Sequence, residues 1–560
     1  MSTEFISTGN GGFFDLADRL GGSTPLRRIL SIIRLQGICN TILCETDELF
    51  KARTCTSALD NSWCARCRDQ FRVLETDSVF VRKTCFKLFF FKYASQENFK
   101  DLCNDDLLGY CVVHHDIFNP NDKPSSDRVK CYVLESVMVA DKDITGFITP
   151  PSTSNVNVLG KEFTIEGGYF TQQDYYTTSC VHASLKCTFK NILPDLDDNA
   201  INKIVSIDNN KRYGREGIVI HEIRKVVDVF SEGMFVTEVI RAASMLTWEF
   251  VRTIYMAIES KYPTLLLFRS PSFQDAGFRA NHVNGHSMAV VGHTFSSHTW
   301  DSYGGYYFHP DAPAHLRSSV LWCEQFVVSD DNMGPFYHLP MRFFHELNTQ
   351  TTFGGGRFIW NNQLSSDLYT VICMNKKSPS VQTLLQIEKT ALNFLEWAYD
   401  ELDKKDIIEE NRILELFFLN AFRSSTELGD DINCGFILRT IYVAKDDYLN
   451  NIKEMQCCVG GAALCALKDV IRDSLPPCFV VIEFSLNELF WINQAKVCEI
   501  IIDPDKFLMD EREKPADCVI FLRIPFYGAL FAEGALTVAM TIEQEKPYSA
   551  MITVSQGAQL

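Results

Sequence analysis

Apolar and polar residues are distributed differently in three successive stretches of the 560-residue chain. In the first stretch, apolar runs at 107–113 and 129–139 have the length and β-branched content of strands. Proline, serine and threonine gather at 149–155, a composition typical of a linker. These patterns predict a first domain of mixed strands and short helices that ends near residue 155.

The second stretch runs to about residue 345 and combines strands with two helices. A pair of glycines at 167–168 is expected to form a turn, and a helical pattern starts at Cys180. A second, amphipathic helix is predicted over 236–260. The predicted strands of this stretch are 162–165, 264–268, 287–294 and 324–329.

After residue 346 the pattern changes to one long helix, predicted over 381–402, with leucines and isoleucines on its apolar side. Strands are predicted at 478–484, 497–502 and 519–524. The fold class is therefore α+β in three domains. These are an N-terminal mixed α/β domain at 1–155, a central domain at 156–345 and a C-terminal α+β domain at 346–560 for interaction or substrate recognition.

Composition narrows the classes of function. Hydrophobic residues make up 46% of the chain, enough for several cores, and the formal net charge is −18. An acidic surface repels phosphate, so no nucleic-acid partner and no membrane partner are expected. The N-terminus lacks the pattern of a signal peptide, and the 20 cysteines are scattered among apolar runs, as reduced thiols are. We expect a cytoplasmic protein.

One cysteine has neighbours that suggest chemistry. Cys180 follows Thr-Thr-Ser and opens a predicted helix, and a helix N-terminus favours the thiolate form of a cysteine. The backbone N–H at that position can donate to an oxyanion, and a glutamine upstream, Gln173 or Gln172, can supply the second donor. His182 on the same helix should point elsewhere and is interpreted as structural.

A base and an orienting group follow in the order that thiol catalysis needs. His286 opens the predicted strand 287–294, which would hold the imidazole rigidly. The next strand ends at Asp330, whose carboxylate would lie beside the base if the two strands are antiparallel neighbours. Asp331 and Asp301 are rivals for this orienting role, and Asp330 is preferred because it ends the strand.

The order Gln, Cys on a helix, His starting a strand and Asp ending the next resembles the papain-like cysteine peptidase superfamily. The similarity covers the central third and is closest to bacterial proteins that resemble bacteriocin-leader (double-glycine) peptidases. It rests on His286-Ser-Met-Ala-Val-Val-Gly292 and on Phe326-Val-Val-Ser-Asp330. It implies a papain-like central domain, with the Cys helix packed on an antiparallel sheet, and the catalytic set Cys180, His286, Asp330 and Gln173.

The resemblance implies a thiol protease, a peptidase or isopeptidase acting on a protein or peptide through a thioester, in a bacterial defence or toxin-like system. An amidase, deamidase or acyltransferase would use the same groups. Val181, where the family often has glycine, and the Gln–Cys spacing instead favour an inactive papain-fold assembly subunit. The C-terminal domain could then hold a homo-oligomer or a partner subunit together.

No cofactor and no metal are predicted. Cys64 and Cys67 have the spacing of half a zinc site, but the second pair of ligands is not well formed. They are interpreted as ordinary thiols.

Overall fold

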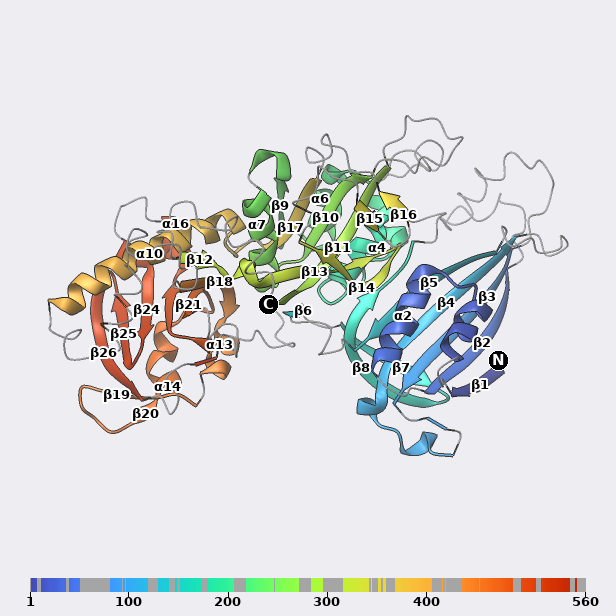
Figure 1. The fold of residues 1–560 in the computed structure, drawn as a ribbon, viewed down its shortest axis with the longest axis horizontal. Helices are drawn as coiled ribbons and strands as arrows, with labels where there is room; N and C mark the ends of the chain where they lie inside the picture. The colour runs from blue at the N-terminus through green and yellow to red at the C-terminus, as the bar shows by residue number, and fades with distance from the viewer. Residues whose placement is uncertain are drawn as a thin grey trace. The chain divides into compact units, whose positions relative to one another are not determined.

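Figure 1 shows the fold of the chain in a computed structural model. The chain divides into two compact units, each made of several segments. Unit one comprises Met1–Met245, Pro263–Thr294 and Gln325–Lys376; unit two comprises Leu246–Tyr262, Phe295–Glu324 and Lys377–Leu560. The structure describes residues 2–7, 12–36, 40–50, 81–92, 94–95, 97–118, 129–139, 147–148, 152–173, 180–205, 218–245, 247–270, 284–295, 316–341, 344, 351–353, 356–358, 368–404, 415, 418, 436–452, 454–486, 495–509, 515–543 and 549–550. Cys64, Cys67 and Asp301 lie outside these residues.

The described residues form a mixed α+β protein with three large sheets whose strand pairs are antiparallel, apart from one parallel pair in unit two. The α+β expectation is thereby confirmed. Among the described residues, no helix is long and apolar enough to cross a membrane.

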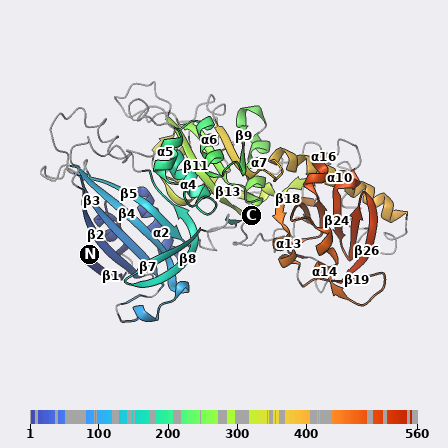
Figure 2. The same ribbon diagram turned by 180° about the vertical axis from the view of Figure 1, so that it is seen from behind.

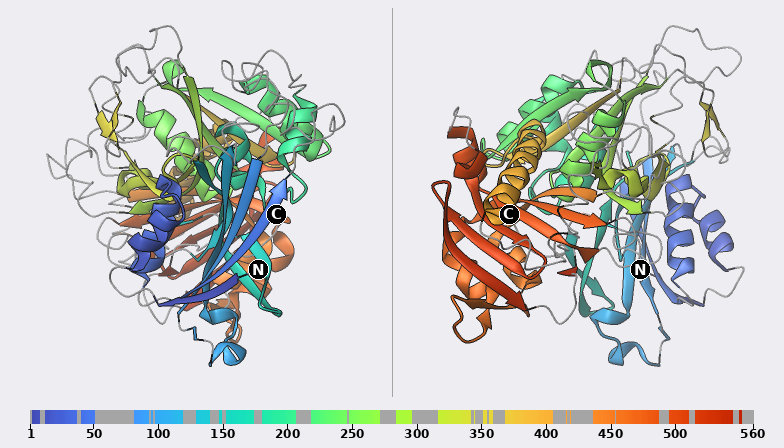
Figure 3. Two further views of the ribbon diagram at one scale, coloured as in Figure 1. Left: turned by 90° about the vertical axis from the view of Figure 1, so that its right-hand side faces the viewer. Right: turned by 60° about the vertical axis from the view of Figure 1, so that its left-hand side comes forward.

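The first sheet belongs to unit one and has the strand order β1-β2-β3-β4-β5-β8-β7. Its strands are β1 (Ser2–Ser7), β2 (Asn40–Phe50), β3 (Val81–Phe91), β4 (Leu107–Phe118), β5 (Val129–Met138), β7 (Ser152–Val158) and β8 (Lys161–Phe170). Helices α1 (Gly12–Arg19) and α2 (Thr24–Leu35) cover one face, as both views in Figure 3 show. A phenylalanine-rich core that includes Phe91, Phe99 and Phe163 lies on the other face.

The second sheet of unit one carries the predicted chemistry and has the order β14-β13-β11-β10-β17-β9, with β6 (Phe147–Ile148) paired to β11. Its strands are β9 (Phe235–Arg241), β10 (Thr264–Ser270), β11 (Asn284–Phe295), β13 (Cys323–Asp330), β14 (Gly334–Pro340) and β17 (Leu368–Asn375). Helices α4 (Cys180–Phe189), α5 (Asp198–Ile204) and α6 (Ile220–Phe230) share one apolar core with β10, β11 and β17. Figure 2 shows α4 and α6 beside β11.

Three local predictions that begin in unit one are wrong. Residues 236–241, predicted as helix, lie in β9, where Val236, Thr237 and Ile240 pair with β17; the helix is α7 (Thr247–Glu259). The β-branched residues of 236–240 fit a pleated strand better than a helix. The expected linker at 149–155 enters β7 at residue 152.

The glycines at 167–168 lie inside β8 and form no turn. A Cβ atom on Gly167 would lie 2.2 Å from the carbonyl oxygen of Met138, so the two strand backbones approach too closely for a side chain. The predicted strands at 107–113, 129–139, 264–268, 287–294 and 324–329 are confirmed, within β4, β5, β10, β11 and β13.

Unit two is built on a nine-stranded sheet with the order β12-β18-β21-β23-β24-β25-β26-β19-β20. The predicted long helix is confirmed as α10 (Val381–Asp403), and the three predicted strands are β21, β23 and β24. The strands are β12 (Leu316–Ser318), β18 (Phe436–Ala444), β19 (Gln456–Val459), β20 (Cys465–Ala466), β21 (Cys478–Leu486), β23 (Cys498–Ile502), β24 (Val519–Ile524), β25 (Tyr527–Ala532) and β26 (Ala535–Glu543). Its shorter helices are α13 (Lys445–Asn451), α14 (Leu467–Ile471) and α16 (Pro504–Met509). Each unit also has a two-stranded sheet. In unit one, β15 (Thr351–Phe353) pairs with β16 (Gly356–Phe358), and in unit two, β22 (Ala495–Lys496) pairs with β27 (Ser549–Ala550).

A buried ionic network crosses the sheet of unit two. Arg439 contacts both Glu259 and Glu483, and Lys496 lies 2.6 Å from Glu483 and 2.5 Å from Glu499. Arg523 lies 2.6 Å from Glu499 and completes the network. Because each carboxylate has a cationic partner, the network is electrostatically matched, as buried charges must be.

Candidate functional site

The first predicted site residue, Cys180, is the first residue of α4, and the thiol is half-buried. The five residues that follow it are all buried, so the first turns of α4 run through the interior. One turn along, the Ser184 hydroxyl donates a 2.9 Å hydrogen bond to the carbonyl oxygen of Ser287. Since Ser287 follows His286 in β11, this bond fixes the start of α4 against the strand that carries the imidazole.

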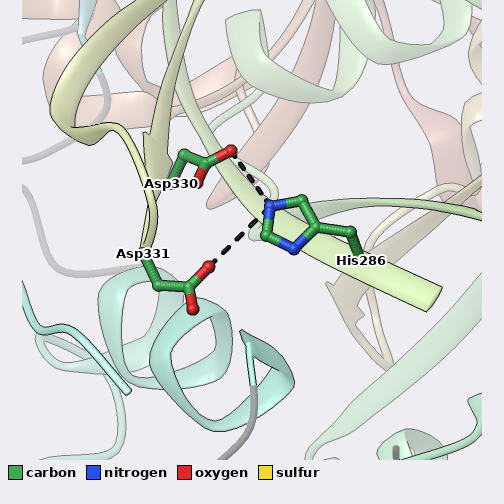
Figure 4. A group of neighbouring side chains, drawn as sticks. All are labelled: His286, Asp330 and Asp331. Atoms are coloured by element: carbon green, nitrogen blue, oxygen red, sulfur yellow. Dashed lines mark hydrogen bonds and ion pairs between the residues drawn. The ribbon is translucent and has the colours of Figure 1, made fainter. Parts of the chain in front are cut away.

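His286 is held from three sides. In the β10–β11 register it lies opposite Phe268, whose ring packs edge-on against the imidazole with a centroid separation of 5.3 Å. Its Nε2 atom lies 3.0 Å from Oδ2 of Asp330 (Figure 4). A hydrogen bond joins the imidazole to the Cys180 side chain.

Asp330 is the last residue of β13, and β13 is the neighbour of β11 in the sheet. Its Oδ1 atom accepts hydrogen bonds from the backbone N–H groups of Asn332 at 2.7 Å and Met333 at 3.2 Å. The carboxylate is thus shared between its own turn, through Oδ1, and His286, through Oδ2. The structure brings Cys180, His286 and Asp330 into one relay, in the order that the sequence predicts.

Asp331 is a second carboxylate at this site, and it faces the same imidazole nitrogen (Figure 4). Its Oδ1 lies 3.8 Å from Nε2 of His286, and its side chain is 0% exposed. Neither carboxylate oxygen accepts a hydrogen bond from another described residue. The distances therefore make Asp330 the partner of His286 and leave Asp331 buried beside it.

Electrostatics at the site separate the two carboxyls. Burial disfavours charge on His286, yet Asp330, Cys180 and Asp331 together raise its pKa well above the usual value. Burial also disfavours charge on Asp330, but the imidazole and the two backbone N–H groups lower the pKa of that carboxyl. Burial raises the pKa of Asp331 to about 7, against the attraction of His286. The favoured state holds His286 protonated and Asp330 ionised.

The two candidate glutamines differ in their surroundings. The Gln172 N–H donates to the Val133 carbonyl oxygen at 2.9 Å, and the Gln172 Oε1 accepts from the Val133 N–H at 3.1 Å. Gln172 is thus buried and tied to β5 through both its backbone and its side chain. Gln173 is half-buried at the last described position before α4, and it remains the predicted oxyanion donor.

Other polar residues near the site have structural partners. His182 is fully buried and its Nε2 lies 2.9 Å from the Asn202 side-chain oxygen, in keeping with the structural interpretation. Among the described residues, His286, Asp330 and Asp331 are the group whose ligand atoms lie close enough to share a metal ion, all within 4.8 Å of one another. One nitrogen and two oxygens would suit a divalent cation, although no metal was predicted here.

Two residues that matter to the geometry had no usable signal in the sequence. Phe268 and Ser184 stand in apolar runs, and only the strand register and the helix packing place them next to His286 and its strand. Asp331 had a weak signal, because an Asp-Asp pair at a strand end offers two carboxylates to one base.

Comparison of the chain with protein-family models, with curated proteins and with solved structures finds no match.

Proposed function

We propose that the chain is a cysteine hydrolase with a papain-like central arrangement, a peptidase or isopeptidase that acts on a protein or peptide. The observation that carries the proposal is the hydrogen-bonded relay from Cys180 through His286 to Asp330. A half-buried thiol at a helix start, a base on a strand and a carboxylate at the end of the adjacent strand form the constellation of nucleophilic catalysis.

The electrostatics support an ion pair between His286 and Asp330 in the resting state. The raised pKa of His286 keeps the imidazolium charged at neutral pH, so a proton donor is in place for the leaving group. Asp330 favours this state further, because its carboxylate is held ionised against Nε2.

The chemistry follows from these positions. The Cys180 thiolate attacks the substrate carbonyl carbon, and the oxyanion that forms is stabilised by N–H donors at the start of α4 together with Gln173. His286 gives its proton to the leaving amine, the C–N bond breaks and a thioester remains. Neutral His286 then takes a proton from water, whose oxygen attacks the thioester, and the C–S bond breaks to release the acid and restore the Cys180 thiolate beside protonated His286.

A peptidyl vinyl sulfone, which alkylates activated thiolates, tests the proposal on the full chain. We expect one probe per chain on Cys180 in the wild-type protein and none in Cys180→Ala. A His286→Ala variant should label at least a hundredfold more slowly, since general bases of this kind contribute about 10²–10⁴-fold. Absence of labelling above the Cys180→Ala background would favour the inactive assembly subunit instead.

A further inference from the structure

The carboxylate of Asp330 depends on the turn that follows it. Asn332 and Met333 donate their backbone N–H groups to Oδ1, and the β13–β14 hairpin closes with Asp330 paired to Gly334. These bonds fix the carboxylate plane, which leaves Oδ2 directed at His286. Any change in the course of residues 331–336 would therefore change the geometry of the relay.

Helix α2, which lies about three hundred residues earlier in the chain, holds this turn in place. Arg28 of α2 donates from Nη2 to the carbonyl oxygen of Phe336 at 2.5 Å and from Nε to that of Pro335 at 3.4 Å. The same guanidinium lies over the ring of Tyr337, with its carbon 5.9 Å from the ring centroid. One side chain thus binds three consecutive residues at the start of β14.

Packing holds the same turn in a backbone conformation that is unfavourable by itself. Gly334 has a φ of 104°, and a Cβ there would lie 2.9 Å from Cβ and Cγ of Arg28. Phe336 has a φ of 48°, which is uncommon for a non-glycine residue, and it is 3% exposed. Its ring lies where a side chain on Gly168 of β8 would be.

We propose that Arg28 is a positioning residue for Asp330. Through Arg28, helix α2 contributes to the geometry of the hydrolase site. The inference rests on the proposed function. Arg28 touches no reacting group; it acts through the turn whose other end is the carboxylate. Phe336 keeps its left-handed backbone conformation because the surrounding contacts hold it there. Arg28 supplies two of the hydrogen bonds among these contacts.

The test replaces Arg28 and measures the thiol, which Arg28 does not touch. Rates of Cys180 alkylation by iodoacetamide are followed from pH 5 to 9 by mass spectrometry of the Cys180 peptide. In Arg28→Met we expect the acid limb of the profile to shift to higher pH by about one unit. This shift lowers the rate of Cys180 alkylation at pH 6 about tenfold. Arg28→Lys, which keeps the charge and one donor, should recover part of the loss.

Arg27→Met is the matched control. Arg27 is the neighbour of Arg28 on α2, is about half exposed, and pairs with Asp18 at 2.7 Å instead of with the turn. Its profile should coincide with that of the wild type. A merely structural role for Arg28 would lower the melting temperature and leave the acid limb in place.

The outcomes separate the two proposals. If wild-type Cys180 reacts at pH 6 no faster than an ordinary exposed thiol, the proposed function itself is wrong. If the wild type is reactive and Arg28→Met has the same pH profile, the positioning role is wrong and the hydrolase proposal stands. Should Arg28→Met fail to fold, Arg28→Lys and Arg28→Gln decide, because a wild-type profile in both would overturn the inference.

Discussion

Asp331 offers a test of the site's electrostatics that requires no substrate. The carboxyl is fully buried, and burial raises its pKa to about 7. A carboxyl in an unfolded chain has a pKa of ~3.9. Between pH ~3.9 and about 7, the folded state therefore keeps a proton on Asp331 that the unfolded state has released. The stability contributed by this proton is present at low pH and is lost as pH rises toward 7.

The magnitude follows from the shift. A pKa difference of about three units corresponds to roughly 4 kcal/mol, at about 1.4 kcal/mol per unit. Asparagine has nearly the same shape and does not titrate. In Asp331→Asn the stability relative to wild type should therefore increase from pH 4 to pH 7 by up to about 4 kcal/mol and then level off. The pH dependence of the difference carries the prediction, because a constant offset between asparagine and aspartic acid cancels.

The assay is thermal unfolding of both proteins at matched ionic strength from pH 4 to 8, followed by calorimetry. We expect the melting temperature of the transition that unfolds unit one to rise in Asp331→Asn relative to wild type as pH increases. Asp195→Asn, which removes an exposed carboxyl, is the control and should show little trend. A difference between Asp331→Asn and wild type that is flat with pH, or that falls, would refute the reasoning.

Three further predictions follow from buried contacts and from the proposed chemistry. Ser184→Ala removes a hydrogen bond to Ser287 and should lower the stability of unit one by about 1 kcal/mol, measured by denaturant unfolding; an unchanged midpoint would contradict that contact. Arg252→Met leaves Glu388 buried without its ion-pair partner, so unit two should lose about 3–5 kcal/mol in the same assay, and a stable variant would contradict the pairing. Dialysis against EDTA should leave probe labelling unchanged, since thiol catalysis uses no metal; a loss that Zn²⁺ restores would indicate a metal site instead.

The sequence predicted those parts of the site that depend on local pattern. The helix that starts at Cys180, the strand that holds His286 and the strand that ends at Asp330 each have their signal within about ten residues. The long helix over Val381–Asp403 was equally accessible, because its apolar period extends over six turns. The preference for Asp330 over Asp331 rested on strand ends, and the two distances to His286 agree with it.

Features that depend on distant partners could not be predicted. Residues 236–241 are a strand because β17, more than 120 residues later, supplies the hydrogen-bonding edge. Arg28 and Phe336 are 308 positions apart, and nothing around Arg28 distinguishes it from Arg27. The raised pKa of Asp331 arises from burial, which the sequence of an Asp-Asp pair at a strand end does not reveal.

The central claim is that Cys180 is activated by His286 and Asp330, and the most direct test compares thiols within one molecule. Cys103 and Cys465 are exposed, whereas Cys180 is half-buried, so exposure alone predicts that Cys180 reacts more slowly. Limiting iodoacetamide at pH 6, with site-resolved mass spectrometry, measures all three rates together. The account predicts that Cys180 reacts at least tenfold faster than either exposed thiol, and that His286→Ala abolishes the advantage. Faster reaction of Cys103 and Cys465 in the folded wild-type protein would contradict it.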